Sequence, residues 1–199
     1  MKKQNFISWV RIGFGALGIA AIVTQLYTSI LNGKNIANFF SFFTIESNIL
    51  ASILFLVLGI LGLKGIRQKS DLIRGAITLY MTMTGIIYVL LLSGSPNLEL
   101  TLPWVNMTLH YILPVAILVD WLVTPPARAI TYKKALSWIS FPIAYVAYSF
   151  IRGAIISWYP YPFLDPGQSG WGYVIIMSLI ITGGVLILIK LLTLRFQKK

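Results

Sequence analysis

The sequence of 199 residues has no cysteine and only one histidine, His110. The absence of cysteine excludes disulfides, thiolate nucleophiles, iron–sulfur clusters and zinc–thiolate sites. A single histidine cannot by itself supply a bis-histidine haem or a His-rich metal site. We therefore expect neither a bound metal nor a cofactor.

Charge is scarce as well, and most of it has one sign. Charged residues make up 11% and apolar residues 57% of the chain, against roughly a quarter and a half in a soluble domain. Five acids face 16 Lys and Arg, which gives a net charge of +11. The bases lie beside long apolar runs and are not interleaved with polar residues, so we do not expect nucleic acid as a partner.

Long uncharged stretches predict how this chain is organised. Six of them occur, and the shorter second and fifth extend past a single charge, Glu46 or Arg152: residues 12–33, 47–63, 75–98, 100–119, 135–151 and 166–189. A helix needs about 20 apolar residues to cross a bilayer. We predict an all-α integral membrane protein with six transmembrane helices, in which residues 1–199 form one domain. The first stretch is too long for a signal peptide and lacks a small-residue cleavage site, so we expect it to be retained.

The distribution of bases predicts the orientation. Fourteen of the 16 lie on the side of the even-numbered connections and the termini: Lys2, Lys3, Arg11, Lys64, Arg67, Lys69, Arg74, Arg128, Lys133, Lys134, Lys190, Arg195, Lys198 and Lys199. The opposite side has Lys34, and Arg152 lies within a span. By the positive-inside rule both termini are cytoplasmic. The same bases favour anionic membrane lipids as partners.

Ionisable residues inside a span are costly and usually face the bundle interior, so His110, Glu46 and Arg152 are candidate functional residues. The competing interpretation is structural. His110 would then hydrogen-bond between helices, and Glu46 and Arg152 would form an ion pair or extend to the outer interface. The glycines of the first two spans (Gly13, Gly15, Gly18, Gly59 and Gly62) are expected to serve close helix packing.

The expected depth of these groups follows from the helical rise. If the second helix begins near Asn38 and the fourth near Pro103, Thr44 and His110 lie about 9 and 10 Å below the outer surface. Arg152 lies about 8 Å before the outer end of its helix. We therefore expect the three to share one depth in the outer half of the bilayer.

Two local patterns sharpen this site. Ser47 and Asn48 follow Thr44 by three and four residues, so the three share one helix face. Asn106 shares a face with His110, and Pro114 lacks the N–H that would bond the His110 carbonyl. These patterns predict a polar layer between helices.

Two acids need separate interpretations. Asp120 lies about 15 Å along the helix from His110, so it cannot orient that imidazole, and we expect it near Arg128. The proline- and aromatic-rich loop at 157–166 suits a membrane interface, which explains Tyr161. Asp165 is not explained by that role, and we consider that it folds back toward His110 or Arg152.

Thr44 and His110 together suggest chemistry. A hydroxyl with a histidine able to take its proton is the minimal unit of nucleophilic acyl transfer, if a donor stabilises the oxyanion. Asn48, Arg152 or a tyrosine hydroxyl could be that donor, and Asp165 or Glu46 could orient the imidazole. Such a site would receive its substrate laterally from the lipid.

Three motifs resemble a known family over nearly the whole chain. They are Phe-Phe-Thr-Ile-Glu-Ser-Asn at 42–48, Leu-His-Tyr-Ile-Leu-Pro at 109–114 with Asp-Trp at 120–121, and Tyr-Pro-Tyr-Pro-Phe-Leu-Asp at 159–165. With six spans, they look like the bacterial branch of the androgen-induced-gene family, which includes the androgen-dependent regulators of tissue factor pathway inhibitor. Its members hydrolyse fatty acid esters of hydroxy fatty acids with an intramembrane threonine and histidine. The resemblance places those roles on Thr44 and His110.

The resulting prediction is a threonine-dependent carboxylic ester hydrolase of lipids in the plasma membrane of a bacterium. Thr44 and His110 are its catalytic residues, with supporting or substrate-binding roles for Ser47, Asn48, Glu46, Asn106, Arg152, Tyr161 and Asp165. In this prediction the phenylalanines of 39–43 line an acyl slot, and Arg152 clamps a substrate carboxylate. Two alternatives stay open: a transporter or lipid-binding protein with a protonatable His/Glu/Arg site, and a structural subunit whose polar groups only join helices.

Overall fold

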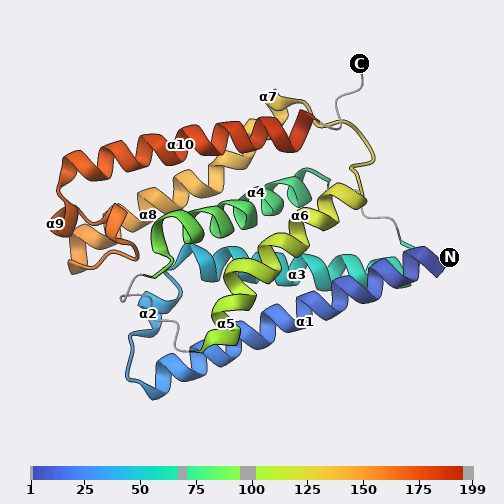
Figure 1. Cartoon of the computed structure of the whole chain (residues 1–199), viewed down its shortest axis with the longest axis horizontal. Helices are drawn as coiled ribbons and strands as arrows, with labels where there is room; N and C mark the ends of the chain where they lie inside the picture. The colour runs from blue at the N-terminus through green and yellow to red at the C-terminus, as the bar shows by residue number, and fades with distance from the viewer. Residues whose placement is uncertain (1, 67–70, 95–101, 195–199) are drawn as a thin grey trace. The chain divides into compact units, whose positions relative to one another are not determined.

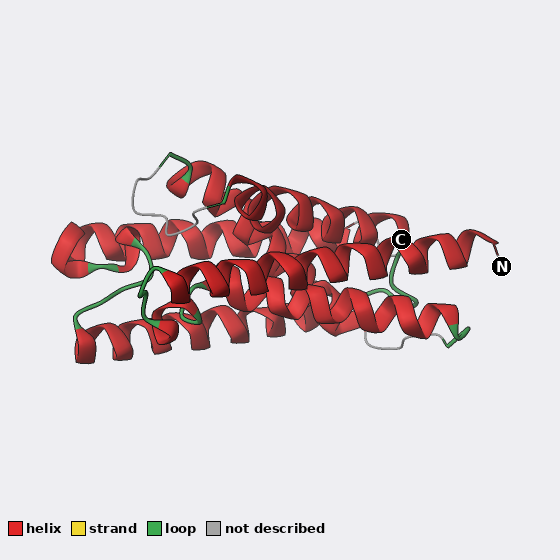
Figure 2. Ribbon diagram, turned by 90° about the horizontal axis from the view of Figure 1, so that it is seen from below, coloured by secondary structure: helices red, strands yellow, loops and turns green. Residues whose placement is uncertain are grey.

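The computed structural model describes residues 2–66, 71–94 and 102–194, without the side chains of Lys2 and Lys3. Helices make up 84% of the structure, and no strand occurs among the residues described. Figure 2, coloured by secondary structure, shows only helices and their connections there. Contacts group the chain into two compact units, Met1–Arg128 and Ala129–Lys199. The single-domain arrangement stays a prediction.

The first unit is built from the helices that carry the candidate catalytic pair. In chain order these are α1 (Lys2–Leu31), α2 (Ile36–Phe39), α3 (Phe43–Leu63), α4 (Asp71–Ile87) with the π-helical η1 (Tyr88–Leu92), and α5 (Pro103–Met107), the π-helical η2 (Thr108–Ile112) and α6 (Leu113–Val123). Helix α1 packs along α3, α3 on α4, and α4 on α6 (Figure 1). Each of these contacts buries part of the apolar surface of both helices.

The second unit consists of α7 (Tyr132–Ala135), η3 (Leu136–Ile139), α8 (Ser140–Ile156), η4 (Pro162–Leu164), α9 (Pro166–Ser169) and α10 (Trp171–Leu194). Helix α10 contacts α7, η4 and α9. Its long side chains, such as Leu179 and Ile187, are mostly exposed, as expected of residues that face lipid.

Among the described residues, six helices are long and apolar enough to cross a membrane: Gln4–Leu31, Phe43–Leu63, Asp71–Leu92, Pro103–Val123, Tyr132–Ile156 and Trp171–Leu194. The predicted number of long apolar helices is confirmed, but several predicted bounds are wrong. The uncharged stretches ended at charged residues, but the first, third and fourth helices continue through Arg11, Arg74 and Asp120. They do so because these three side chains pair with one another. The predicted span 75–98 and its successor also run into residues 95–101, which lie outside the described residues, as do Arg67, Lys69, Arg195, Lys198 and Lys199.

The start of the second span differs from the prediction in a way that affects the site. The short helix α2 ends at Phe39, and α3 begins at Phe43, so the chain is not one helix from Asn38 onward. Thr44 therefore lies in the first turn of α3. The depth calculated from a continuous helix does not apply to it.

Close helix packing depends on the glycines where neighbours approach. A Cβ on Gly15 would lie 2.8 Å from the Leu56 side chain and 2.9 Å from the Ser52 carbonyl, so only glycine lets α1 and α3 come this close. Gly18, Gly59 and Gly62 are similarly crowded. Gly13 has no neighbour within 4 Å, and its predicted packing role is wrong.

Candidate functional site

A buried group of uncharged polar side chains lies where α3 packs against α4, which η1 continues, and against η2, which continues α5. We call it the neutral cluster, and its members are Thr44, Ser47, Asn48, Thr84, Tyr88, Asn106 and His110. All but Asn106 are at most 8% exposed, and Asn106 is half-buried. The expected polar layer between helices therefore exists within the first unit.

Asn48 connects the turn that carries Thr44 to the turn that carries His110. Its amide nitrogen donates to the Thr44 carbonyl at 2.8 Å and to the Leu109 carbonyl at 3.1 Å. Both amide hydrogens are then engaged, so Asn48 cannot donate to an oxyanion as we had considered. Its Oδ1 is buried and has no hydrogen-bond partner among the residues described.

A second contact ties the same face of α3 to α4. The Ser47 hydroxyl lies 2.9 Å from the Thr84 hydroxyl, and it also lies 3.2 Å from the Thr44 carbonyl. The shared face predicted for Thr44, Ser47 and Asn48 is thus confirmed as an interhelical face.

The imidazole of His110 is held by Asn106, one turn earlier. Its Nδ1 lies 2.8 Å from Asn106 Oδ1 and 3.3 Å from the Asn106 backbone carbonyl. A carbonyl oxygen only accepts, so Nδ1 carries the hydrogen and donates it. In the neutral ring, Nε2 is then left as the lone-pair nitrogen, which is the arrangement of a general base.

Tyr88, which is not among the predicted site residues, completes this arrangement. Its ring stacks on the imidazole of His110 with centroids 3.9 Å apart and planes 19° apart. Its hydroxyl accepts a hydrogen bond of 2.7 Å from Asn106 Nδ2. Its spacing of four from Thr84 continues a polar face on α4, which is the signal that could have identified it.

Both Tyr88 and His110 lie in π-helical turns, which occur mostly as single turns and often at functional sites. Pro114, which has no N–H to bond the His110 carbonyl, is the second residue of α6, directly after η2 ends at Ile112. Gly85 lets α4 approach here, since a Cβ on it would lie 3.4 Å from that carbonyl. The imidazole is therefore positioned by irregular backbone held between packed helices.

A second polar group of the first unit is charged. This charged cluster consists of Arg11, Asp71, Arg74, Asp120 and Thr124. Arg11 Nε donates to Asp120 Oδ1 at 2.7 Å, and Arg74 donates to Asp71 at 2.9 Å and to Asp120 at 3.3 Å. The Thr124 hydroxyl accepts from both arginines. Asp120 is thus paired with Arg11 and Arg74. The expectation that it lies near Arg128 stays a prediction.

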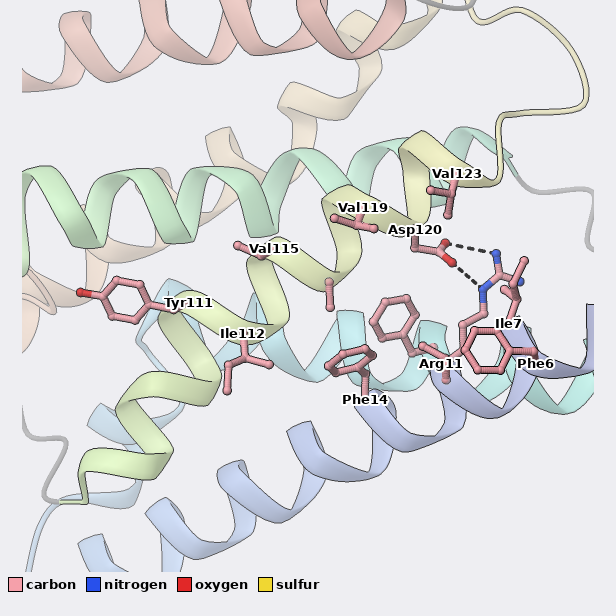
Figure 3. Close-up of a pocket in the computed structure, with 13 residues that line it drawn as sticks. Phe6, Ile7, Arg11, Phe14, Tyr111, Ile112, Val115, Val119, Asp120 and Val123 are labelled. Carbon is pink, nitrogen blue, oxygen red and sulfur yellow. Dashed lines mark hydrogen bonds and ion pairs between the residues drawn. The ribbon is translucent and has the colours of Figure 1, made fainter. Parts of the chain in front are cut away.

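An apolar groove of about 630 Å³ runs between α1 and α6 (Figure 3). Phe14, Phe55, Val115 and Val119 are among its lining residues, and the ion pair of Arg11 and Asp120 lies at one end. At the opposite end, Tyr111 meets the ring of Tyr88 edge-on, with centroids 5.5 Å apart. The groove therefore reaches the edge of the neutral cluster.

The predicted phenylalanine slot is not this groove. None of the residues of 39–43 line it. Phe39 and Phe43 are buried, and Phe43 packs edge-on against Tyr80. Glu46 is half-buried, and its carboxylate makes no hydrogen bond or ion pair with the described residues, so the group that holds His110 Nδ1 is Asn106.

Three predicted site residues belong to the second unit. Arg152 lies over the ring of Trp158, 5.0 Å from its centroid. Tyr161 is buried and stacks on Phe163 at 5.1 Å. Asp165 caps α9 by accepting from the backbone of Gly167 and Gln168. The pair Asp165-Pro166 at the start of α9 could have predicted this cap. The fold-back of Asp165 toward His110 stays a prediction.

Metal binding has no candidate among residues 2–66, 71–94 and 102–194. No group of three or more His, Asp or Glu gathers there. The reactive groups are therefore a hydroxyl, an imidazole, amides and a phenol.

The chain matches no family model, and comparisons with curated proteins and with solved structures find no match. Fold and site define a class: the described residues are all-helical and include six helices suited to a membrane, and a buried neutral cluster lies among the helices of the first unit. The resemblance to the androgen-induced-gene family stays a prediction.

Proposed function

We propose that this protein is a multi-pass membrane enzyme that hydrolyses lipid esters, with Thr44 as nucleophile and His110 as general base and acid. The observation that carries the proposal is the double hydrogen bond of Asn48, which joins the turns of Thr44 and His110. The protonated Nδ1 of His110 supports it, because the opposite nitrogen is the one that can accept a proton.

The chemistry proceeds in two halves. Thr44 Oγ1 attacks the ester carbonyl carbon and gives its proton to His110 Nε2. The tetrahedral intermediate collapses, the ester C–O bond breaks, and the leaving alcohol takes that proton. Water then attacks the acyl-threonine and gives a proton to His110, which returns it to Thr44 as the fatty acid departs. The sum is ester plus water to acid plus alcohol.

The apolar groove supports a lipid as substrate. Its walls suit an acyl chain, and its end at Tyr111 adjoins the ring that stacks on the imidazole. The buried, unpartnered Oδ1 of Asn48 supplies an acceptor for a substrate hydroxyl or water, since such atoms are rare unless a partner is expected. Fatty acid esters of hydroxy fatty acids supply the acyl chain, and the donor to Asn48 Oδ1 is then a water or the hydroxyl that hydrolysis releases.

Orientation and location are part of the proposal. The charged cluster lies at the beginnings of α1 and α4 and the end of α6, whereas Thr44 and His110 lie near the opposite helix ends. With most bases on the side of the charged cluster, the positive-inside rule makes that end cytoplasmic. The neutral cluster then opens to the outer leaflet of a plasma membrane.

The test is hydrolysis of a panel of lipid esters, including esters of hydroxy fatty acids, by the purified full-length protein. We expect Thr44→Ala and His110→Ala to lower turnover by about 10³-fold or more, with thermal unfolding close to that of wild type. Thr82→Ala is the matched control, because its hydroxyl bonds only a carbonyl of its own helix. An inert wild type, or full activity in Thr44→Ala, contradicts the proposal.

A lipid-binding or transport protein is the second candidate. The observation in its favour is the length of the groove, which extends from Tyr111, beside the neutral cluster, to the Arg11–Asp120 pair. Lipid binding that survives Thr44→Ala, together with no ester hydrolysis by wild type, supports this candidate.

A further inference from the structure

The direction of each hydrogen bond around His110 can be assigned. Nδ1 donates to the backbone and side-chain oxygens of Asn106, so the amide oxygen of Asn106 faces the imidazole. The amide nitrogen therefore faces Tyr88 and donates to its hydroxyl. The Tyr88 oxygen is an acceptor in this bond, and its own hydrogen points elsewhere.

That hydrogen has no acceptor among the described residues. The oxygen is fixed by Asn106, and the ring plane is fixed by stacking on the imidazole, so the rotation of the O–H bond is the remaining freedom of this side chain. A directed donor next to the general base is what an acyl-transfer site requires for its oxyanion. Asn48 cannot fill this role, because both of its amide hydrogens are engaged.

We propose that Tyr88 is a third catalytic residue, whose hydroxyl donates a hydrogen bond to the ester carbonyl oxygen as that oxygen becomes negatively charged. This inference rests on the proposed function. No proton leaves Tyr88 in this role. The hydrogen bond forms to the carbonyl oxygen, strengthens in the tetrahedral intermediate and weakens when the C–O bond breaks.

The hydrogen-bond chain also couples the two charges that develop in the reaction. When His110 takes the proton of Thr44, its Nδ1 becomes a stronger donor to Asn106. Hydrogen bonds in a chain polarise one another, so the amide then donates more strongly to Tyr88, and Tyr88 becomes a better donor to the oxyanion. The chain from His110 through Asn106 to Tyr88 thus stabilises both ends of the transition state.

The experiment compares wild type, Tyr88→Phe and Tyr27→Phe on the ester that wild type hydrolyses fastest. Tyr27 is an exposed tyrosine of α1 in the same unit and controls for loss of a hydroxyl. Removing one oxyanion donor lowers kcat by about 10²–10³-fold. We expect that decrease for Tyr88→Phe with little change in KM, and kcat within about twofold of wild type for Tyr27→Phe on the same principle.

A second measurement separates catalysis from structure. Replacing Tyr88 by 3-fluorotyrosine and 3,5-difluorotyrosine keeps the ring and changes the donor strength of the hydroxyl stepwise. A graded change in kcat at constant thermal stability supports the proposal. Equal kcat across this series, or full turnover in Tyr88→Phe, overturns the role of Tyr88 while leaving the hydrolase standing. A wild type that hydrolyses no ester overturns both.

Discussion

The charged cluster and the neutral cluster lie toward opposite ends of the first unit's helices and differ in how completely their polar groups are paired. In the charged cluster, two arginines and two aspartates bond one another and Thr124. In the neutral cluster, Asn48 Oδ1 and the Tyr88 hydrogen have no described partner. A saturated network fastens helices, whereas one with spare donors and acceptors has capacity left for a ligand.

Packing reinforces the same contrast. The charged cluster is further shielded by Trp121, whose ring lies 5.5 Å from the guanidinium carbon of Arg74. The neutral cluster is held by two π-helical turns and the close approach at Gly85. We therefore expect substitutions in the first cluster to change stability and those in the second to change turnover.

The largest effect on stability is expected from Asp120→Asn. It removes the charge shared by Arg11 and Arg74, and breaking a buried ion pair from one side costs about 3–5 kcal/mol. Denaturant unfolding in mixed micelles measures this change. Glu46→Gln is the control, because Glu46 pairs with no described residue, and its unfolding free energy should change by less than about 0.5 kcal/mol. Equal effects of the two substitutions contradict a structural role for the charged cluster.

A smaller effect, on turnover, is expected from Asn106→Ala. The backbone carbonyl of Asn106 still accepts from Nδ1, so part of the orientation survives. We expect kcat to fall by about 10²-fold, at the lower end of what a positioned general base contributes. Thr108→Val is the matched control for Asn106→Ala, because Thr108 is a buried neighbour whose hydroxyl bonds only the Trp104 carbonyl. Loss of stability in Asn106→Ala without loss of kcat would make the neutral cluster structural too.

The smallest effect is expected at Asp165, outside both clusters. Asp165→Ala removes the cap of α9 and should lower the unfolding free energy by about 1 kcal/mol, whereas Asp165→Asn preserves the cap. Comparing the two by thermal unfolding separates capping from charge. A marked loss of ester hydrolysis in Asp165→Asn would return Asp165 to the candidate site residues.

The sequence predicts what depends on local spacing. The six spans follow from apolar length, and the shared faces of Thr44 with Asn48 and of Asn106 with His110 follow from helical periodicity. These features need no knowledge of which helices meet, so a single chain segment is sufficient to predict them.

Features that depend on distant partners were not predictable in this way. Arg11 and Asp120 are 109 residues apart in the sequence, so neither could be identified as the partner of the other. Because they pair, the helices continue through charged residues at which the predicted spans ended. Tyr88 in an apolar segment resembles a packing residue until Asn106 and His110 are placed beside it. The break between α2 and α3 has no proline or glycine to signal it.

The two π-helical turns have a consequence for how the third and fourth spans are compared with other sequences. A π turn contains one residue more than an α turn, as if a single codon had been inserted, and each residue corresponds to about 100° of rotation. A helical wheel drawn continuously through η1 or η2 therefore assigns the residues on one side to the wrong face. Deleting one residue within 108–112 would rotate the segment that carries His110 relative to α6. A one-residue gap at this place in a sequence alignment therefore indicates a relative whose fourth span lacks the π turn.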